Sequence, residues 1–525
     1  MSGLFDNRND GKARRQERSQ KEQTNKHKQK RLTIIVVSVL IIAFVGALII
    51  NSSFLRRTAT AVSIDGRAFS AAEFDYFYNR GIMEYTELVN TQMPDFASAL
   101  LPARGQLLSS QIQDPNTGET WADFFRQRAK ASMAQLVQLY NAANAAGFTM
   151  SEEDLQNMEN AITAIIEEAD FAVSMGQFRS PQAYLQFVFG SSMNEAVLRD
   201  IHKFIFTAIS YNNHVRESVT FTQAQLEEFY LENQDRFDIF TYRILPITPE
   251  AQNPMDFTTG DELADAQEEA QEQAVALANQ LVGEITTEDE FIAAARAFDE
   301  ELFGEPDSTL TQVQGEFIDP TFVDWLTDAS RTYGDTITFK TINGAQLLFF
   351  VDRNDNNYQL ASMRQILLLR EQVQFWEFPE GENDPEFIAA VELAEHQARE
   401  RALAALAAFE AAGGTEEALI ALMEEYSDDT TPGGFYENIA MFPYETATGR
   451  LMRIVPELEQ WLFDESRQFG DFELIHTEAF GYHLMFFAGR GDTMRNFIAT
   501  DGLRTQAHSE WSDTLPEAGE AHRHW

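Results

Sequence analysis

An internal repeat in the C-terminal half constrains the fold of this chain more than any other feature of its sequence. Residues 322–353 and 458–490 carry matching residues in the same order, with one extra residue in the second copy. A repeat of this kind indicates two copies of one structural unit. The matching pairs are Trp325 and Trp461, Asp328 and Asp464, Ser330 and Ser466, Arg331 and Arg467, Gly334 and Gly470, Asp335 and Asp471, Thr341 and Thr477, Gly344 and Gly481, Phe349 and Phe486, Phe350 and Phe487, and Arg353 and Arg490.

Both copies also begin alike. A short strand candidate, residues 242–245 or 364–367, precedes a long Ala/Glu-rich helix over residues 261–282 or 385–412, and a run of strands closes each copy. We therefore expect two tandem α+β domains, residues 237–355 and 360–492. Residues 493–525 are interpreted as a C-terminal tail, and its His508, His522 and His524 do not have the spacing of a metal site.

The region before the repeat, residues 60–236, is predicted to be mostly helical. It opens with alternating apolar and polar residues around Asp65 and Gly66, which is typical of a hairpin. Ser70 and Glu73 then have the spacing of a capping box at the start of a helix. Further helices are expected over residues 121–146, from Ser151 onward, and over residues 194–217 and 222–233.

The N-terminus has the pattern of a membrane anchor. Residues 32–50 contain no charged side chain, and residues 1–31 contain ten Lys or Arg against four acidic residues. Such a run is long enough to cross a bilayer, and the basic flank places the N-terminus in the cytoplasm. A buried core helix and a cleaved signal peptide are the alternatives. We predict a single-pass cell-membrane protein whose bulk is extracytoplasmic.

Charge and cysteine content narrow the classes of partner and host. The formal net charge is −44 despite the basic tail, which argues against nucleic acid and anionic lipid as partners of the outer region. There is no cysteine, so disulfides and thiol chemistry are excluded. An exported chain without cysteine suggests a Gram-positive bacterial host.

Three motifs in the second copy occur in the order found in a known family. They are Met363 to Leu367, Tyr426 to Asp429 ahead of Gly433 and Gly434, and Phe480 to Leu484. With these motifs the second copy resembles the parvulin family of peptidyl-prolyl isomerases. Residues 60–236, together with the run at 226–237, resemble the chaperone parts of extracytoplasmic foldases of the PrsA and SurA kind. The resemblance implies FKBP-like α+β domains that use no cofactor or metal and act on unfolded or exported polypeptides with X-Pro bonds.

The resemblance also implies a set of site residues. His483 matches the second core histidine of the family, and Asp429 matches its cysteine-or-aspartate position. Gln365 stands where the family has its first histidine, which breaks the usual histidine pair, and the stretch from Ala440 to Arg453 is longer than usual. The catalytic candidates are Asp429, His483 and Gln365, and the candidates for the proline pocket are Tyr436, Ile454, Leu458 and Phe480.

Proline isomerisation makes and breaks no bond. The barrier to rotation about a peptide bond is ~18–20 kcal/mol, so a catalyst needs an apolar pocket and polar groups that favour the twisted imide. The first copy contains no histidine, has Arg243 near the first histidine position and Gln346 at the second, and lacks the Ser-Asp-Asp and Gly-Gly segments. It is interpreted as a degenerate, inactive copy.

Three functions are compatible with these patterns. The first is a membrane-anchored foldase with isomerase activity in residues 360–492. The second is a holdase that has lost catalysis in both copies, and the third is an envelope scaffold that binds partner proteins through its helices. Clients, oligomeric state and the packing of the helical domain are not specified by the sequence.

Overall fold

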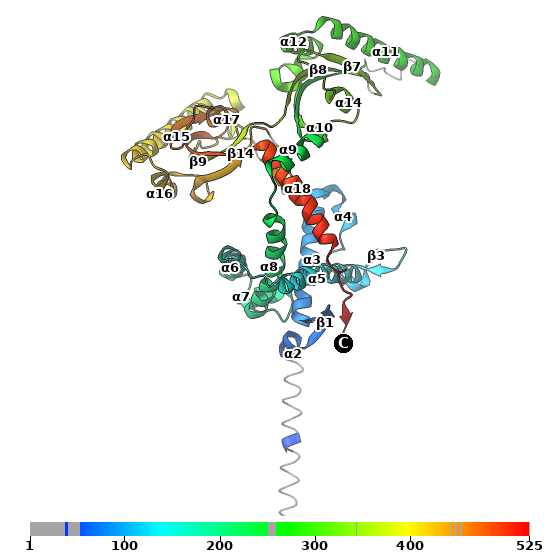
Figure 1. Cartoon of the computed structure of the whole chain (residues 1–525), viewed down its shortest axis with the longest axis vertical. Helices are drawn as coiled ribbons and strands as arrows, with labels where there is room; N and C mark the ends of the chain where they lie inside the picture. Colours follow the sequence, from blue (N-terminus) through cyan, green and yellow to red (C-terminus); the bar gives the residue numbers. More distant parts are fainter. Residues whose placement is uncertain are drawn as a thin grey trace, which may run out of the picture. The chain divides into compact units, whose positions relative to one another are not determined.

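The computed structural model describes residues 37–39, 53–249, 259–342, 344–442, 444–446, 449–451 and 454–523. The predicted membrane span, residues 32–50, lies outside these ranges except for residues 37–39. Within the described residues, no helix combines the length and apolar character needed to cross a bilayer. The described chain forms two compact units (Figure 1). Unit 1 contains the described residues up to Ser218 together with those from His508 onward, and unit 2 contains Val219–Ala507.

Unit 1 is a helical bundle with a small sheet whose first two strands precede the long helices in the sequence. Strands β1 (Thr60–Ile64) and β2 (Arg67–Ser70) form the predicted hairpin, with Asp65 and Gly66 at positive φ in its turn. Ser70 and Glu73 form the predicted capping box, a device that contributes about 1 kcal/mol to a helix. The helices are α2 (Ser53–Thr58), α3 (Ala71–Gln92), α4 (Ala97–Leu100), α5 (Trp121–Ala145), α6 (Glu152–Ser174), α7 (Pro181–Phe189) and α8 (Glu195–Ser218), and the short hairpin before α5 is β3 (Ile112–Asp114) with β4 (Glu119–Thr120).

Buried aromatic and aliphatic side chains hold this bundle together. Phe69, Tyr76, Met133, Ile162 and Phe204 share one core, which joins β2 to α3, α5, α6 and α8. The predicted helices over 121–146, from Ser151 and over 194–217 are confirmed to within a residue or two of their ends.

The two copies of the repeat form sheets of identical topology in unit 2. The first sheet has the order β6-β5-β8-β7 and the second β10-β9-β14-β13, with every neighbouring pair antiparallel. The strands are β5 (Ile239–Ile247), β6 (Leu310–Gln314), β7 (Thr336–Thr341), β8 (Gly344–Asn354), β9 (Gln359–Leu369), β10 (Phe435–Ile439), β13 (Phe472–Thr477) and β14 (Gly481–Thr493), and an additional hairpin is formed by β11 (Tyr444–Thr446) and β12 (Gly449–Leu451).

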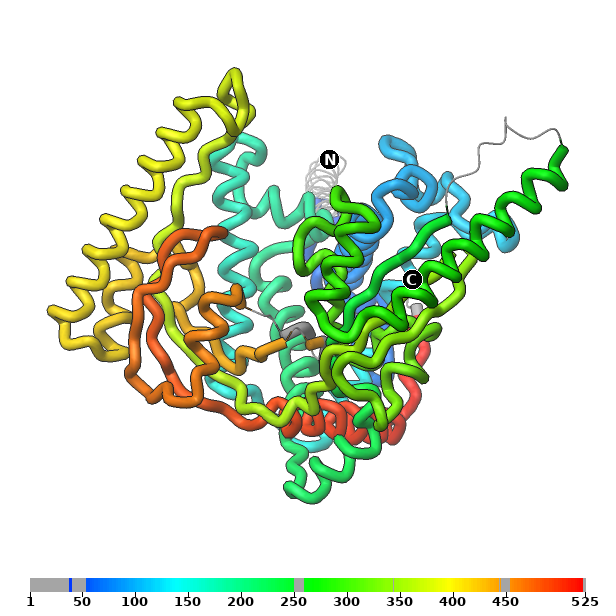
Figure 2. Tube along the Cα trace, turned by 90° about the horizontal axis from the view of Figure 1, so that it is seen from above, coloured from blue at the N-terminus to red at the C-terminus, as the bar shows by residue number. Residues whose placement is uncertain are grey.

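One long helix lies along each sheet, α11 (Gly260–Glu284) against β8 and α15 (Pro385–Ala411) against β14 (Figure 2). Small residues make this close packing possible, because the buried positions of both helices are largely alanines four residues apart. Both helices match their predicted ranges. Shorter helices complete the copies: α12 (Glu288–Phe298), α13 (Glu300–Phe303) and α14 (Val323–Leu326) in the first, and α16 (Glu416–Tyr426) and α17 (Pro456–Leu462) in the second.

The connections around the two copies form a separate core of unit 2. Helices α9 (Gln223–Glu232), α10 (Gln234–Phe237) and α18 (Met494–Asp513) meet the start of β9, and Leu226, Tyr230, Leu360, Met494 and Ile498 are buried together there. The boundary between the units therefore falls after Ser218, whereas the sequence predicted a helical domain extending to residue 236. The reason is that the buried side chains of α9 pack on unit 2.

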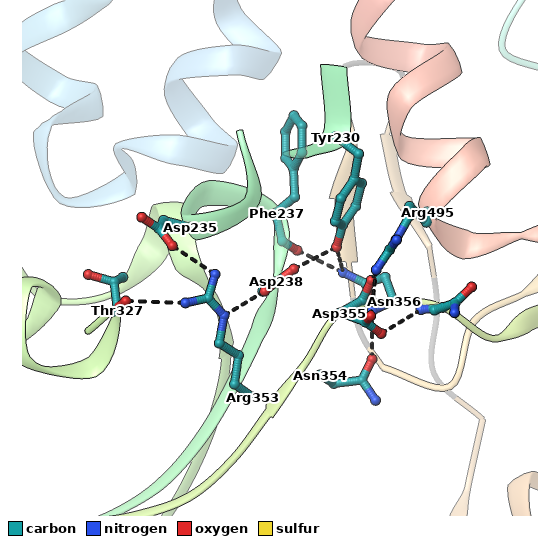
Figure 3. Close-up of polar contacts among 11 residues, drawn as sticks. Tyr230, Asp235, Phe237, Asp238, Thr327, Arg353, Asn354, Asp355, Asn356 and Arg495 are labelled. Atoms are coloured by element: carbon teal, nitrogen blue, oxygen red, sulfur yellow. Dashed lines mark hydrogen bonds and ion pairs between the residues drawn. The ribbon is translucent and has the colours of Figure 1, made fainter. Parts of the chain in front are cut away.

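Polar side chains buried beside this core link the same segments (Figure 3). The Asp238 carboxylate is fully buried and accepts hydrogen bonds from Tyr230 (2.7 Å) and Arg353 (2.6 Å). Asn356, also fully buried, donates to the Tyr230 hydroxyl at 3.0 Å and to the Phe237 carbonyl at 2.9 Å. These bonds connect the entry to the first copy with the connection between the copies.

Residues 493–525, expected as a tail, instead contain regular structure. The 20-residue helix α18 follows β14 directly, and β15 (His522–Arg523) pairs with β1, opposite Val62 and Ser63. Met494, Ile498 and Ala499 are the buried residues of α18, a spacing that gives only a short apolar stripe in the sequence. The packing of this helix is therefore determined by tertiary contacts that the sequence pattern does not display.

Candidate functional site

The central candidates lie on neighbouring strands of the second copy. Gln365 of β9 is opposite Met485 of β14, and His483 is opposite Leu367. Side chains alternate between the faces of a strand. Gln365 and His483 therefore share the sheet face of Met485 and α17, while the intervening Ile366 and Leu484 pack beneath α15 and α16.

A continuous chain of hydrogen bonds joins all three predicted catalytic residues. His483 Nδ1 lies 2.9 Å from Gln365 Oε1, and Gln365 Nε2 donates to Asp429 Oδ2 at 2.8 Å. Tyr436 donates its hydroxyl to the same Asp429 oxygen at 2.8 Å. Gln365 and His483 are 6% and 4% exposed, whereas Asp429 is half-buried. The hydrogen-bonded chain is therefore buried at His483 and reaches solvent at Asp429.

The direction of these bonds follows from the donor and acceptor capacity of each group. An ionised Asp429 can only accept, so the amide of Gln365 faces it and the Gln365 carbonyl faces His483. His483 must then carry its proton on Nδ1, and its Nε2 accepts from the Thr477 hydroxyl 3.0 Å away. Donors thus point along the whole chain toward the carboxylate of Asp429.

Burial and hydrogen bonding set the protonation states. Burial lowers the pKa of His483 to about 4, despite the opposing charge of Asp429, so the imidazole is neutral at pH 7. Burial also acts to raise the pKa of Asp429, but hydrogen bonds from the Thr431 backbone, Gln365 and Tyr436 outweigh it and the net pKa is lowered. The arrangement holds one carboxylate charge next to neutral donors.

The predicted pocket residues lie beside this chain. Tyr436, Ile454 and Leu458 belong to one apolar cluster with Met485 and Phe487. Leu458 is only 3% exposed, so it forms the floor of the cluster, whereas Tyr436 and Ile454 are half-buried. Phe480 is 44% exposed, and its ring stands edge-on to His483 with centroids 6.1 Å apart.

Three further residues of the site were not identified from the sequence. The sequence marks Thr477 only as a residue of the repeat. In the structure it is buried and bonded to His483. Thr431 donates its backbone N–H to Asp429 at 2.8 Å and its hydroxyl lies 2.9 Å from that of Tyr436. Ser427 accepts the backbone N–H groups of Leu367 and Asp429, each at 3.1 Å. The Ser-Asp-Asp-Thr-Thr run could have indicated Ser427 and Thr431, since Ser, Thr and Asp side chains often bond to nearby backbone groups.

The first copy keeps the scaffold of this site without its polar chain. Strand register places Arg243 opposite Phe349, as Arg364 is opposite Phe486, so Arg243 corresponds to Arg364 and the apolar Ile244 to Gln365. Arg243 therefore lies next to the first histidine position, as predicted, but on the opposite face of the strand, and Ile244 occupies the position itself. Gln346 does occupy the position of His483.

The corresponding arginines have a structural role in both copies. Arg243 pairs with Glu288 at 2.7 Å and Arg364 with Glu416 at 2.5 Å, and each glutamate is the first residue of the second helix of its copy. Each arginine also donates to a backbone carbonyl, of Pro306 or Gly433. These pairs attach the short helices α12 and α16 to the sheets.

Among the described residues, no group of three His, Cys, Asp or Glu side chains is placed to hold a metal ion. His522 lies in β15 and pairs with Ser63 of β1, and His524 is outside the described ranges.

Comparisons with known proteins give only distant similarity. No protein-family model and no curated protein matches the chain. Among solved structures, the chain is similar to one from work on PEB4 and Cj1289, two SurA-like chaperones of Campylobacter jejuni. The identity is 14% and the TM-score is 0.17, and the match covers 56% of this chain and 83% of the other. The chain is also similar to PrsA from Bacillus subtilis, with 12% identity, coverage of 54% and 88%, and a TM-score of 0.15.

Proposed function

We propose that this protein is a membrane-anchored extracytoplasmic folding factor whose second repeat copy, residues 360–492, isomerises X-Pro bonds in unfolded exported polypeptides. The observation that carries the proposal is the hydrogen-bonded chain from Thr477 through His483 and Gln365 to Asp429, which lies beside the apolar cluster of Tyr436, Ile454 and Leu458.

The chemistry of the imide explains why such a site would catalyse rotation. The planar imide carries partial negative charge on its carbonyl oxygen, and twisting reduces that charge and localises a lone pair on nitrogen. A fixed carboxylate near the carbonyl therefore disfavours the planar form relative to the transition state. The donors of Gln365, Tyr436 and Thr431 keep the charge of Asp429 in place.

The neutral state of His483 fits a positioning role. It orients Gln365 through its Nδ1–H, and Gln365 in turn orients Asp429. A glutamine in place of the first histidine preserves this connection because it both accepts and donates. Proton transfer is not required, since no bond is broken.

Activity is tested with a protease-coupled proline-isomerisation assay on the full outer region. We expect catalysis above the buffer rate that falls at least about tenfold in an Asp429→Ala, His483→Ala double variant. Gln346→Ala, at the position of His483 in the first copy, is the matched control and should leave the rate unchanged. Rates equal to buffer for the folded wild-type protein would remove the catalytic part of the proposal.

The anchor is a separate part of the proposal, supported by the uncharged run at residues 32–50 and the basic residues before it. Externally added protease should digest the outer region of intact cells and leave an N-terminal fragment in the membrane. Recovery of the whole protein from the culture medium would contradict anchoring.

A holdase is the second candidate, favoured by a cavity in unit 1. It has a volume of about 780 Å³ and is lined by Phe77, Leu136, Ile165, Ile205 and Phe206 among others. Suppression of client aggregation that is unchanged in the Asp429→Ala, His483→Ala variant would support holding without catalysis.

A further inference from the structure

Four exposed apolar side chains lie at the end of β9, in the segment that follows it, and in the β13–β14 turn. They are Leu369 (40% exposed), Phe375 (43%), Trp376 (68%) and Phe480 (44%), and we refer to them as the aromatic rim. Large apolar side chains exposed in neighbouring segments are candidates for a binding surface. Phe480 connects the rim to the candidate site, since its ring contacts His483.

The rim is joined to the site by specific bonds. Arg370 donates its backbone N–H to the Phe480 carbonyl at 2.8 Å, which ties the end of β9 to the hairpin turn. Leu369 donates its backbone N–H to Asp428 Oδ2 at 2.8 Å, and Asp428 directly precedes Asp429 in the chain. Leu369 and Phe480 are therefore held beside the site, and Phe375 follows Leu369 by six residues.

The segment that carries Phe375 and Trp376 is ordered by its own contacts. The two rings lie 5.2 Å apart, edge to face, and Phe378 packs on Phe387 of α15 at 5.5 Å. Asp384 is buried and accepts backbone N–H groups of Glu386 (2.9 Å) and Glu380 (3.3 Å), which closes the segment onto the start of α15. Its aromatic pair is thus presented on a formed surface.

This segment projects past the sheet. Glu395 of α15 contacts His476 of β13 at 3.1 Å, near the turn, and α15 begins ten residues earlier. At 1.5 Å per residue, the first turns of α15 extend about 15 Å beyond that contact. Figure 2 shows the connection between β9 and α15 extending beyond the β13–β14 hairpin.

The segment that carries Phe375 and Trp376 is acidic, whereas Arg370 at the end of β9 is paired with Glu395 at 3.7 Å. Residues 371–386 include no Lys or Arg, and their exposed acids are Glu371, Glu377, Glu380, Glu382 and Glu386. Acidic surroundings of this kind favour a basic partner. They repel anionic lipid, and a second copy of this chain would also be repelled because the formal net charge is −44.

We infer that the aromatic rim binds the part of an unfolded polypeptide that flanks the isomerised proline, and that it selects flanks combining aromatic or aliphatic residues with Lys or Arg. The inference rests on the proposed isomerase function and names the class of segment that this function would serve best. The rim supplies apolar contact, and the five glutamates supply attraction for the basic residues.

The test uses fluorescein-labelled 16-residue peptides that share an Ala-Pro centre and differ in one flank. One flank is Phe/Leu with Lys/Arg, the second Ser/Gly with Lys/Arg, and the third Phe/Leu with Glu/Asp. Fluorescence anisotropy with the full outer region should show the first peptide binding about tenfold more tightly than the others. A Phe375→Ser, Trp376→Ser variant should remove this preference. Phe469→Ser, an aromatic residue 64% exposed in the same copy, should retain it.

Charge is tested separately by Glu371→Gln, Glu377→Gln and Glu380→Gln together. This variant should lower the salt dependence of binding to the first peptide. Equal affinity of wild type for all three peptides, or an unchanged preference in the Phe375→Ser, Trp376→Ser variant, would overturn the inference. The inference would also be overturned if the Phe375→Ser, Trp376→Ser variant left peptide affinity unchanged but altered self-association in sedimentation or binding to anionic vesicles.

The outcomes separate this inference from the proposed function. Isomerisation of a short proline peptide together with equal binding of the three long peptides defeats only the rim. Absence of both isomerisation and peptide binding defeats the proposed function and the rim with it.

Discussion

Arg353 donates a hydrogen bond from Nε to Oδ2 of Asp238 at 2.6 Å, and the Asp238 side chain is entirely buried. The pair joins the end of β8 to the residue before β5. It therefore lies where the chain enters and leaves the first copy of the repeat.

Replacing Arg353 by Leu should destabilise unit 2 by about 3–5 kcal/mol, because it leaves the Asp238 charge buried without its cationic partner. Urea unfolding of the full-length protein measures this. Arg490→Leu is the matched control, since Arg490 has the same place in the second copy but donates to the backbone carbonyl of Asp464 at 2.9 Å. A cost for Arg353→Leu no greater than for Arg490→Leu would contradict the role of the ion pair.

His483 should make the stability of the second copy depend on pH. Burial lowers its pKa from 6.5 to about 4, so between these values the unfolded chain binds the extra proton. The free energy of unfolding then falls by up to about 3 kcal/mol as the pH decreases from about 6.5 to about 4. Urea unfolding at several pH values should show this slope reduced in His483→Gln. It should persist in His396→Gln, whose side chain is 66% exposed.

Gln365→Leu should separate the two ends of the polar chain. His483 Nδ1–H loses its acceptor in a buried position, which costs about 1–3 kcal/mol in the free energy of unfolding. The pKa of Asp429 should rise toward its ordinary value, since one of its donors is removed. Chemical denaturation and carboxylate titration by NMR measure the two effects. Gln346→Leu in the first copy should cost less, and equal costs would argue against the chain as an organised unit.

Gly481 allows the turn beside the candidate site. Its φ is +117°, and a Cβ there would lie 2.6 Å from the Leu368 carbonyl oxygen and 2.8 Å from the Arg370 nitrogen. Gly481→Ala should therefore destabilise the second copy more than Gly470→Ala, where φ is +93° but no atom lies within 4 Å of the added Cβ. The Gly470 change should cost about 1–3 kcal/mol from backbone strain. Similar losses for both variants in thermal unfolding would show that crowding at Gly481 is relieved.

The repeat explains how much of unit 2 could be predicted. Paired residues such as Trp325 and Trp461 make the same bond, since each carbonyl accepts from the matching arginine, Arg331 or Arg467. Register within a strand was less accessible, because Arg243 and Ile244 are both compatible with a strand and only pairing partners distinguish them. A shift of one residue exchanges the faces of the sheet.

Within the candidate site, sequence motifs identified the members and their order but not their bonds. Gln365, His483, Asp429 and Tyr436 come from separate segments, and their contact depends on the pairing of β9 with β14 and β10. Thr477 was visible only as a repeat residue paired with Thr341. In the first copy the position of His483 holds Gln346, so Thr341 has no histidine to bond although it matches Thr477 in the repeat.

The pairing of β15 with β1 has a consequence for the order of synthesis. Gly519 donates its backbone N–H to the Asp65 carboxylate at 2.8 Å, across a separation of 454 residues. A chain made from its N-terminus presents Asp65 early and Gly519 near the end, so unit 1 cannot acquire all its contacts until unit 2 has been made. Contacts of such sequence separation slow folding. During its own synthesis this protein would therefore spend a period with an unfinished N-terminal unit and a β1 edge open to other strands.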